Sequence, residues 1–334
     1  MRKKFLLTMI LSSLIFYKSG YAQVKWAQTG FNFLSISSDA RAGGMGLAVA
    51  SVSANRSALF HNPATMSDIQ NFMSFSLSTN SWIADIKHLS LSLILRPFSG
   101  NYGVIGLSLQ SVDYGEFKGT MRYDNTDGYI DTEIFEPSAL AIGIGYAKPI
   151  TDWFGVGGQI KFCYQYLGKA IVPEGNAYAT KSNVADVIAF DFGTHFKTGI
   201  KSLAFGMCVR NFSREVKYEV EGFQLPLLFT FGISANVLDF FNVVKDHKLL
   251  VAVDATHPRS HPEQLLLGAE YTIFETLSLR IGYVTNNSED NITYGIGLSS
   301  SMLSSKYGVV SGDYSYTPFG RFGNVQRLTL RIDM

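Results

Sequence analysis

Residues 325–332 read Val-Gln-Arg-Leu-Thr-Leu-Arg-Ile, and large apolar side chains alternate along them with polar ones. Successive side chains leave a pleated backbone on opposite faces, so this period of two predicts a β-strand. Residues 88–95, His-Leu-Ser-Leu-Ser-Leu-Ile-Leu, repeat the pattern with four leucines on one side. Each of these strands is therefore expected to separate two different surroundings.

About fourteen such segments follow one another along the chain, and none after residue 22 is long enough for a transmembrane helix. They are predicted at residues 72–80, 87–96, 102–112, 137–148, 154–167, 183–197, 202–212, 225–236, 247–257, 263–272, 275–285, 291–301, 306–317 and 324–332. An even number of strands brings both ends of a bacterial barrel to the periplasmic side. The fold class predicted is all-β, a 14-stranded antiparallel transmembrane β-barrel.

The first 71 residues differ from this pattern. Residues 1–22 combine a basic start, a short apolar run and a small-residue end, which is the pattern of a signal peptide. Residues 23–71 alternate poorly and contain glycines and an Asn-Pro step, so we expect a hatch segment in or at the barrel lumen. Residues 72–334 are expected to form the barrel, and the localisation expected is the bacterial cell outer membrane.

Composition supports a barrel in contact with outer-membrane lipid. Charged residues make up only 16% of the chain, aromatic residues reach 13%, and glycine occurs 31 times. Apolar outward faces, interfacial aromatics and glycines at close approaches require this mixture. Without the four basic residues of the signal peptide, 24 basic residues face 27 acidic ones, so nothing indicates nucleic acid as a partner.

The connections between the predicted strands are unequal in length. Counted from the periplasm, the long ones at 113–136, 168–182 and 213–224 all fall on the external side, whereas most periplasmic connections are short. Outer-membrane barrels show this asymmetry. Charged strand residues such as Lys161 and Asp191 are expected to point into the lumen, because a charge facing lipid is costly.

Several chemical motifs were weighed and favour no active site. The chain has no Gly-x-Ser-x-Gly, and a catalytic pairing of His88 or His195 with a serine would depend on chance placement across strands. His257 and His261 flank a proline-rich loop without a third ligand nearby. Cys163 and Cys208 lie on non-adjacent predicted strands, which favours two buried thiols over a disulfide. We expect no enzyme, no metal site and no cofactor.

Three regions of the chain carry a family resemblance, the N-terminal one in two stretches. Residues 39–46, Asp-Ala-Arg-Ala-Gly-Gly-Met-Gly, with residues 58–64, Ala-Leu-Phe-His-Asn-Pro-Ala, resemble the N-terminus of the PorV/PorQ family. Residues 112–117 resemble that family's segment after the third strand, and residues 313–324 its last hairpin. That family is itself similar to FadL-type transporters, which share a fourteen-strand barrel and a hatch containing Asn-Pro-Ala.

The resemblance implies a component of the type IX secretion system of Bacteroidota. Its partners would be the type IX translocon, the sortase or the C-terminal domains of cargo proteins, held by external loops. The family-signature residues of the hatch are Asp39, Arg41, Gly43, Gly44, Asn62 and Pro63, and the external loop candidates are Tyr114, Glu116, Phe117, Phe223 and Leu225.

Two alternatives stay open. The first is a FadL-like transporter of long-chain fatty acids or other hydrophobic small molecules. In that case the loop at residues 223–228 and the hatch would form the path of a lipid-like ligand. The second is a soluble secreted all-β protein.

Overall fold

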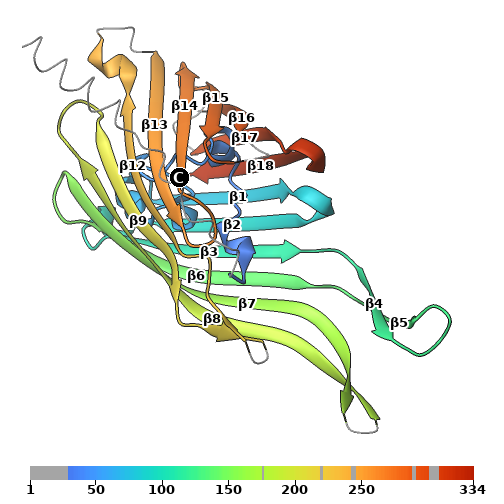
Figure 1. The fold of residues 1–334 in the computed structure, drawn as a ribbon. Helices are drawn as coiled ribbons and strands as arrows, with labels where there is room; N and C mark the ends of the chain where they lie inside the picture. The colour runs from blue at the N-terminus through green and yellow to red at the C-terminus, as the bar shows by residue number, and fades with distance from the viewer. Residues whose placement is uncertain (1–28, 175–176, 219–220, 242–245, 288–290, 301–307) are drawn as a thin grey trace, which may run out of the picture.

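The computed structural model describes residues 29–174, 177–218, 221–241, 246–287, 291–300 and 308–334. The predicted signal peptide at residues 1–22 lies outside them. Fourteen antiparallel strands close into one barrel in which each strand pairs with its neighbours in the chain and β1 pairs with β18 (Figure 1). None of the helices among these residues is long and apolar enough to span a membrane.

The strands of the barrel lie close to the predicted segments. They are β1 (Met73–Ser81), β2 (Lys87–Leu95), β3 (Val104–Asp113), β6 (Ser138–Pro149), β7 (Phe154–Glu174), β8 (Ala177–Lys197), β9 (Ala204–Ser213), β12 (Leu228–Asn236), β13 (His247–Pro258), β14 (Gln264–Ile273), β15 (Leu277–Val284), β16 (Ile292–Ser299), β17 (Val309–Pro318) and β18 (Asn324–Asp333). The predicted fold class is therefore confirmed.

The alternation separates lumen from lipid as predicted. In β18, Thr329 is fully buried, whereas Leu328 and Leu330 on either side are each 51% exposed on the outer wall. The same alternation around the barrel leaves an apolar outer belt, and an apolar belt of this kind is what a bilayer requires. Lys161 and Asp191 are buried on the inner face, where they form an ion pair of 2.8 Å.

The prediction of a loop at residues 168–182 is wrong. After a register shift between Tyr166 and Lys169, β7 and β8 continue as a two-stranded ribbon beyond the barrel. Gly168 has a φ of +98°, which is the backbone conformation that glycine favours in a bulge. A free ribbon tolerates Gly168 and Pro173, because its outer edges need no partners.

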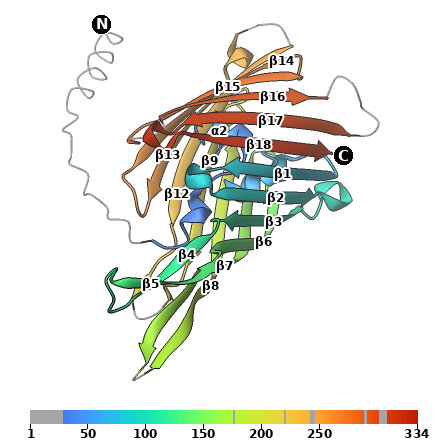
Figure 2. The same ribbon diagram turned by 90° about the vertical axis from the view of Figure 1, so that its right-hand side faces the viewer.

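The other two long connections also contain strands. Residues 113–136 include the hairpin β4 (Phe117–Arg122) and β5 (Tyr129–Phe135), and the connection after β9 includes β10 (Val216–Lys217) and β11 (Gly222–Phe223). Figure 2 shows the β4–β5 hairpin and the β7–β8 ribbon at the end of the barrel away from the C-terminus. We call this end outer, and the end with Met334 inner.

Short 3₁₀ turns cover several connections. At the outer end these are η4 (Ile83–Asp85) and η7 (Gly320–Phe322), and at the inner end η5 (Pro97–Gly100) and η6 (Val237–Phe240). Aromatic side chains near the strand ends are only partly interfacial. Trp153 is exposed, as an interfacial aromatic would be, but Trp82 lines a cavity of the lumen and Tyr114 packs against a buried apolar cluster.

Candidate functional site: the plugged lumen

Residues 29–71 fill the lumen and are called the hatch below. Four short elements form it, η1 (Asn32–Ser35), α2 (Ala40–Gly44), η2 (Ala58–Phe60) and η3 (Pro63–Asp68). It begins at the outer end, where Gly30 N donates to Gln224 O at 3.2 Å. It finishes at the inner end, where Gln70 O accepts from Arg96 Nη1 at 3.0 Å, just before β1. The hatch therefore runs through the barrel from one mouth to the other.

Glycines of the wall and of the hatch allow the two backbones to touch. A Cβ built on Gly282 would lie 2.0 Å from Gly46 N, and one on Gly44 would lie 2.9 Å from Gly295 Cα. Real Cβ atoms do not approach that closely, so a larger residue would have to displace the hatch. Gly43 is packed in the same way, because its Cβ would meet the side chain of Ser315 at 2.7 Å.

The Asn-Pro step begins the last turn of the hatch. Asn62 Oδ1 accepts from Ala64 N at 3.1 Å and caps η3, while Pro63 occupies the first turn, where no backbone donor is needed. The amide of Asn62 donates to Ala50 O at 2.7 Å and to Thr194 O at 3.1 Å. One side chain thus caps a turn, joins two parts of the hatch and attaches them to β8.

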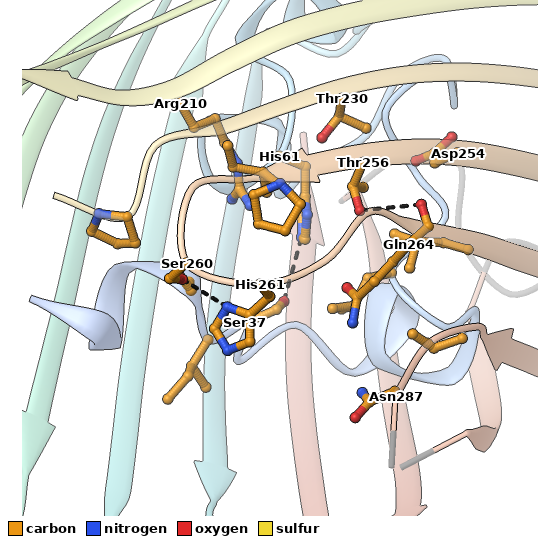
Figure 3. Close-up of a pocket in the computed structure, with 18 of the residues that line it drawn as sticks. Ser37, His61, Arg210, Thr230, Asp254, Thr256, Ser260, His261, Gln264 and Asn287 are labelled. Atoms are coloured by element: carbon orange, nitrogen blue, oxygen red, sulfur yellow. Dashed lines mark hydrogen bonds between the residues drawn. The ribbon is translucent and has the colours of Figure 1, made fainter. Parts of the chain in front are cut away.

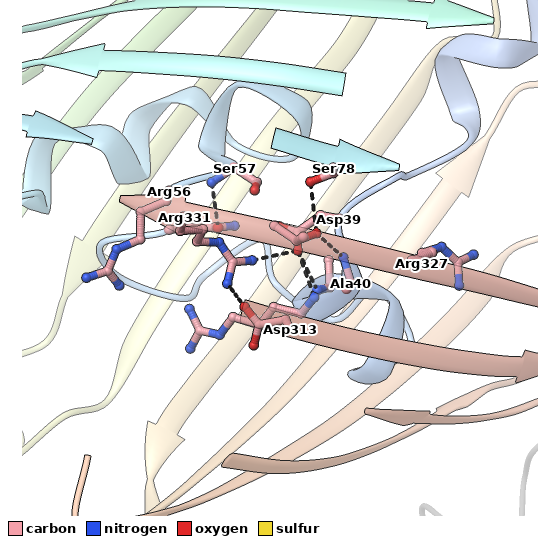
Figure 4. A network of polar contacts seen from close by, with 12 residues as sticks. Asp39, Ala40, Arg56, Ser57, Ser78, Asp313, Arg327 and Arg331 are labelled. Atoms are coloured by element: carbon pink, nitrogen blue, oxygen red, sulfur yellow. Dashed lines mark hydrogen bonds and ion pairs between the residues drawn. The ribbon is translucent and has the colours of Figure 1, made fainter. Parts of the chain in front are cut away.

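A ring of alternating charges fixes α2 to the wall, and Figure 4 shows the part in which Arg331 lies between Asp39 and Asp313. Arg331 binds Asp39 at 2.7 Å and also Asp313, and Arg280 binds Asp313 and Glu270 at 2.5 Å each. Arg41 closes the ring by contacting Glu270 at 2.6 Å, and its own backbone N–H donates to Asp39 Oδ1 at 2.7 Å. Three arginines therefore balance three carboxylates in the lumen.

The ring keeps its hatch members charged. Burial alone would raise the pKa of Asp39, but the charge of Arg331, helped by His61 and by bonds from Ser57 and the backbone, lowers that pKa to about 2. Burial opposes the charge of Arg41, yet the neighbouring Glu270 raises the pKa of the guanidinium. Both groups are ionised at neutral pH, so the ring holds together as ion pairs.

A cavity of about 590 Å³ lies between the hatch and the outer connections (Figure 3). Its apolar lining comes from both sides, with Leu47 and Val49 from the hatch, Leu227, Leu228, Leu266 and Val284 from the wall, and Trp82, Ile83 and Phe319 at the outer rim. Known small-molecule pockets span roughly 300–1,000 Å³ and combine apolar walls with a few polar groups. We call this space the outer cavity.

Polar groups in the outer cavity largely hold the hatch. His61 Nε2 lies 3.4 Å from Ser37 Oγ, Arg210 donates to Phe60 O, and Asp254 Oδ2 accepts from Ala50 N at 2.8 Å. Burial, together with the charge of Arg210, lowers the pKa of His61 to about 4. His61 is therefore neutral at neutral pH, and the cavity combines a mostly apolar surface with the polar side chains of Arg210 and Asp254.

His195 lies in an arrangement that resembles a catalytic triad but is not poised for catalysis. Its Nδ1 is 3.0 Å from Asp68 Oδ2, and its Nε2 is 3.5 Å from Ser53 Oγ. The same Nε2 lies 2.9 Å from Ser51 O, a carbonyl that can only accept, so Nε2 carries a hydrogen. A general base needs a free lone pair toward the hydroxyl, so His195 instead fastens the hatch to β8.

Neither ring nitrogen of His88 has a hydrogen-bond partner among the described residues.

The external candidates from the sequence separate into two groups. Phe223 stacks on Phe31 of the hatch with centroids 6.1 Å apart, and Leu225 is fully buried in the same apolar cluster, against which Tyr114 packs. Glu116 and Phe117 lie outside this cluster on the approach to the β4–β5 hairpin, where Phe117 stacks on Phe135 at 6.0 Å. The structure thus brings Phe223, Leu225 and Tyr114 together at the outer end of the hatch.

The hatch candidates come together only in part. Asp39, Arg41, Gly43 and Gly44 all belong to or border α2, whereas Asn62 and Pro63 hold the opposite part of the hatch. The sequence predicts that charged strand residues point into the lumen, but it does not show that Glu270, Arg280 and Arg331 share one ring. The available signal was their position on the inward face of each strand.

Cysteine and histidine pairs give no metal site within the described part of the chain. Cys163 and Cys208 are both buried free thiols. His257 pairs with Glu263 at 2.9 Å, and no group of three or more potential ligands gathers among the described residues.

Comparison with known proteins gives structural likenesses alone. No family model and no curated protein sequence matches the chain. The toluene transporter TbuX of Ralstonia pickettii superposes with a TM-score of 0.56 at 14% identity, covering 91% of this chain and 98% of TbuX. The toluene transporter TodX of Pseudomonas putida gives 0.57 at 12% identity, covering 93% and 98%.

A FadL homologue of Pseudomonas aeruginosa gives a TM-score of 0.56 at 12% identity, covering 89% of this chain and 98% of the homologue. At such low identity these likenesses establish the fold. They agree with the closed fourteen-strand barrel. This chain is therefore an outer-membrane β-barrel with the FadL-like fold.

Proposed function

We propose that the protein is an outer-membrane channel that admits hydrophobic small molecules. The observation that carries the proposal is the outer cavity, which lies between the outer rim and the hatch and has an apolar lining from both. Two proteins of similar fold are toluene transporters by name, which supports the same class of ligand here. The cavity lies where a molecule entering from outside would first leave water.

Leu266 allows a direct test, because it points into the outer cavity while its neighbour Leu265 points outward with 40% exposure. A Leu266→Trp variant would fill part of the cavity, whereas Leu265→Trp adds the same bulk to the lipid face. We expect host cells that express Leu266→Trp to take up labelled toluene more slowly than cells with the unchanged protein or with Leu265→Trp.

Equal uptake in all three strains, at equal amounts of folded protein in the outer membrane, would contradict the proposal. So would uptake no faster than in cells without the protein. Heat-modifiable gel migration of each variant checks that the barrel has formed.

A second function is favoured by a different observation. The β4–β5 hairpin and the β7–β8 ribbon project beyond the outer end of the barrel and carry exposed apolar side chains, among them Phe117 (48%), Ile134 (62%) and Tyr178 (60%) (Figure 2). Exposed apolar groups on rigid projections fit contacts with protein partners. We propose these projections as the docking surface for a type IX translocon, sortase or cargo C-terminal domain.

The test is affinity purification from native membranes. We expect the paired change Phe117→Ser with Ile134→Ser to lose partners that the unchanged protein brings along. The control is Phe98→Ser, which removes a 74% exposed aromatic at the inner end. The same partners with all three proteins, or no secretion component with any, would rule out this docking surface.

A further inference from the structure

The lumen contains a second large cavity below the first. It has a volume of about 410 Å³ and is bounded by the inner ends of the strands, and we call it the inner cavity. Its lining is strongly polar and includes Arg41, Glu270, Ser278, Arg280 and Asp313. The outer and inner cavities are therefore opposite in character, one largely apolar and one charged.

Both cavities follow the same three strands. Toward the outer end, Thr256 of β13, Leu266 of β14 and Val284 of β15 line the outer cavity. Toward the inner end, Lys248 of β13, Thr272 of β14 and Ser278 of β15 line the inner cavity. The two spaces are thus stacked along β13–β15 on one side of the barrel.

Residues 45–48 of the hatch lie between the two cavities. The hatch contributes Arg41 to the inner cavity and Leu47 to the outer one, so the chain crosses from one to the other in this short segment. Its seat on the wall is made of small residues. A Cβ on Gly268 would lie 2.5 Å from Met45 O, and Gly282 lies opposite Gly268 in the sheet and touches Gly46. At residues 45–48 the hatch backbone therefore rests directly on the wall between the two cavities.

Few polar contacts join this turn to the wall. Gly46 N donates to Thr293 Oγ1 at 3.1 Å, and the same hydroxyl donates to Gly44 O at 3.2 Å. Within the hatch, Leu47 N donates to Ala42 O at 2.8 Å, and Met45 packs in a buried apolar cluster. The two hydrogen bonds of Thr293 can exchange for bonds to water at a modest net cost.

The half of the hatch around Leu59 and Met66 has no cavity of comparable volume beside it. Leu59 and Met66 are fully buried against Gly106 and Gly145 of the wall. The cavity on that side has a volume of about 20 Å³, which is room for about one water molecule. Both halves of the hatch have packed apolar clusters, but only residues 45–48 have a large cavity on each side into which they could move.

We propose that residues 45–48 are the gate of a permeation path along β13–β15, and that the rest of the hatch stays fixed while this turn moves. The inference rests on the proposed channel function, and it identifies the part of the lumen that opens. It assigns the decisive positions to Met45, Gly46 and Ala48 with their seats Gly268 and Gly282.

One experiment tests the gate without any substrate. Met45 and Met66 are both completely buried methionines of the hatch, one in the gate and one in the opposite half. In planar bilayers with potassium chloride, we expect Met45→Ala to raise the ion conductance above that of the unchanged protein, and Met66→Ala to leave it unchanged. A larger conductance from Met66→Ala, or no increase from Met45→Ala, would overturn the proposal.

Disulfide tethers test the movement. A Cβ on Gly268 lies 3.3 Å from Ala48 Cβ, and a Cβ on Gly155 lies 3.5 Å from Ser67 Cβ in the fixed half. Bridged cysteines have Cβ atoms roughly 3.5–4.5 Å apart, so the Ser67–Gly155 pair needs little adjustment. The Ala48–Gly268 pair also requires Met45 O to shift away from the new Cβ, and the reduced form of the same variant controls for that shift. In a Cys163→Ala, Cys208→Ala background, oxidised Ala48→Cys/Gly268→Cys should lose toluene uptake and regain it on reduction, while Ser67→Cys/Gly155→Cys keeps it.

Loss of uptake with both tethers would mean that the whole hatch moves, and retention with both would place the path elsewhere. Either result would overturn the proposal that residues 45–48 are the gate. If the cysteine-free background itself took up no toluene, the proposed function would fail, while the conductance of the two methionine variants would still decide whether residues 45–48 close the lumen.

Discussion

Single glycines determine how the wall and the hatch fit together. Gly282 and Gly268 sit on the inward face of neighbouring strands and touch the hatch backbone directly. Their inward direction could be predicted from the alternation, because Arg280 and Glu270 lie two residues away on the same face. The partner of each glycine could not be predicted, since the contact joins segments separated by more than two hundred residues.

Glycines that touch the hatch and glycines that do not should respond differently to substitution. We expect Gly282→Ala to destabilise the barrel by about 1–3 kcal/mol or to displace the hatch, because its Cβ would collide with Gly46 N. Gly312→Ala is the control, since a Cβ there meets only Leu330 Cδ2 at 3.7 Å. Thermal unfolding in detergent compares them, and equal melting temperatures would show that the hatch does not rest on Gly282.

The charge ring stabilises the short helix α2 of the hatch through contacts with the barrel wall. α2 is only five residues long and could not be stable alone, so its ends depend on Asp39 as cap and on the ion pairs of Asp39 and Arg41. Removing one member of a buried ion pair typically costs about 3–5 kcal/mol, because the partner is left unpaired. The ring therefore fixes α2 in place, whereas no ion pair holds the following turn, which meets the wall through Thr293 and the apolar cluster of Met45.

Strand elements were predictable to within a few residues wherever both faces meet different surroundings. The prediction failed for residues 168–182 because the ribbon leaves the membrane there, and the lipid no longer imposes alternation. The short turns of the hatch could not be predicted from the sequence either. Their conformation is set by contacts such as Asn62 with Thr194, which depend on the closed barrel.

At the scale of the whole molecule, the barrel has an apolar outside, a charged inner cavity and a largely apolar outer cavity. The sequence predicted the inside and outside of the wall, because charges and leucines alternate along each strand. It did not predict the cavities, since their volume depends on how far residues 29–71 fill the lumen. The proposed function therefore rests on the folded arrangement more than on any motif.

The most direct measurement of the account is a crystal structure of the full protein grown with a bromotoluene. Bromine gives an anomalous signal that locates the ligand independently of side-chain interpretation. We predict a peak in the outer cavity, beside Leu47, Leu266 and Val284. Bromine found only on the lipid-facing wall, with the outer cavity holding water alone, would contradict the claim that this barrel admits hydrophobic small molecules.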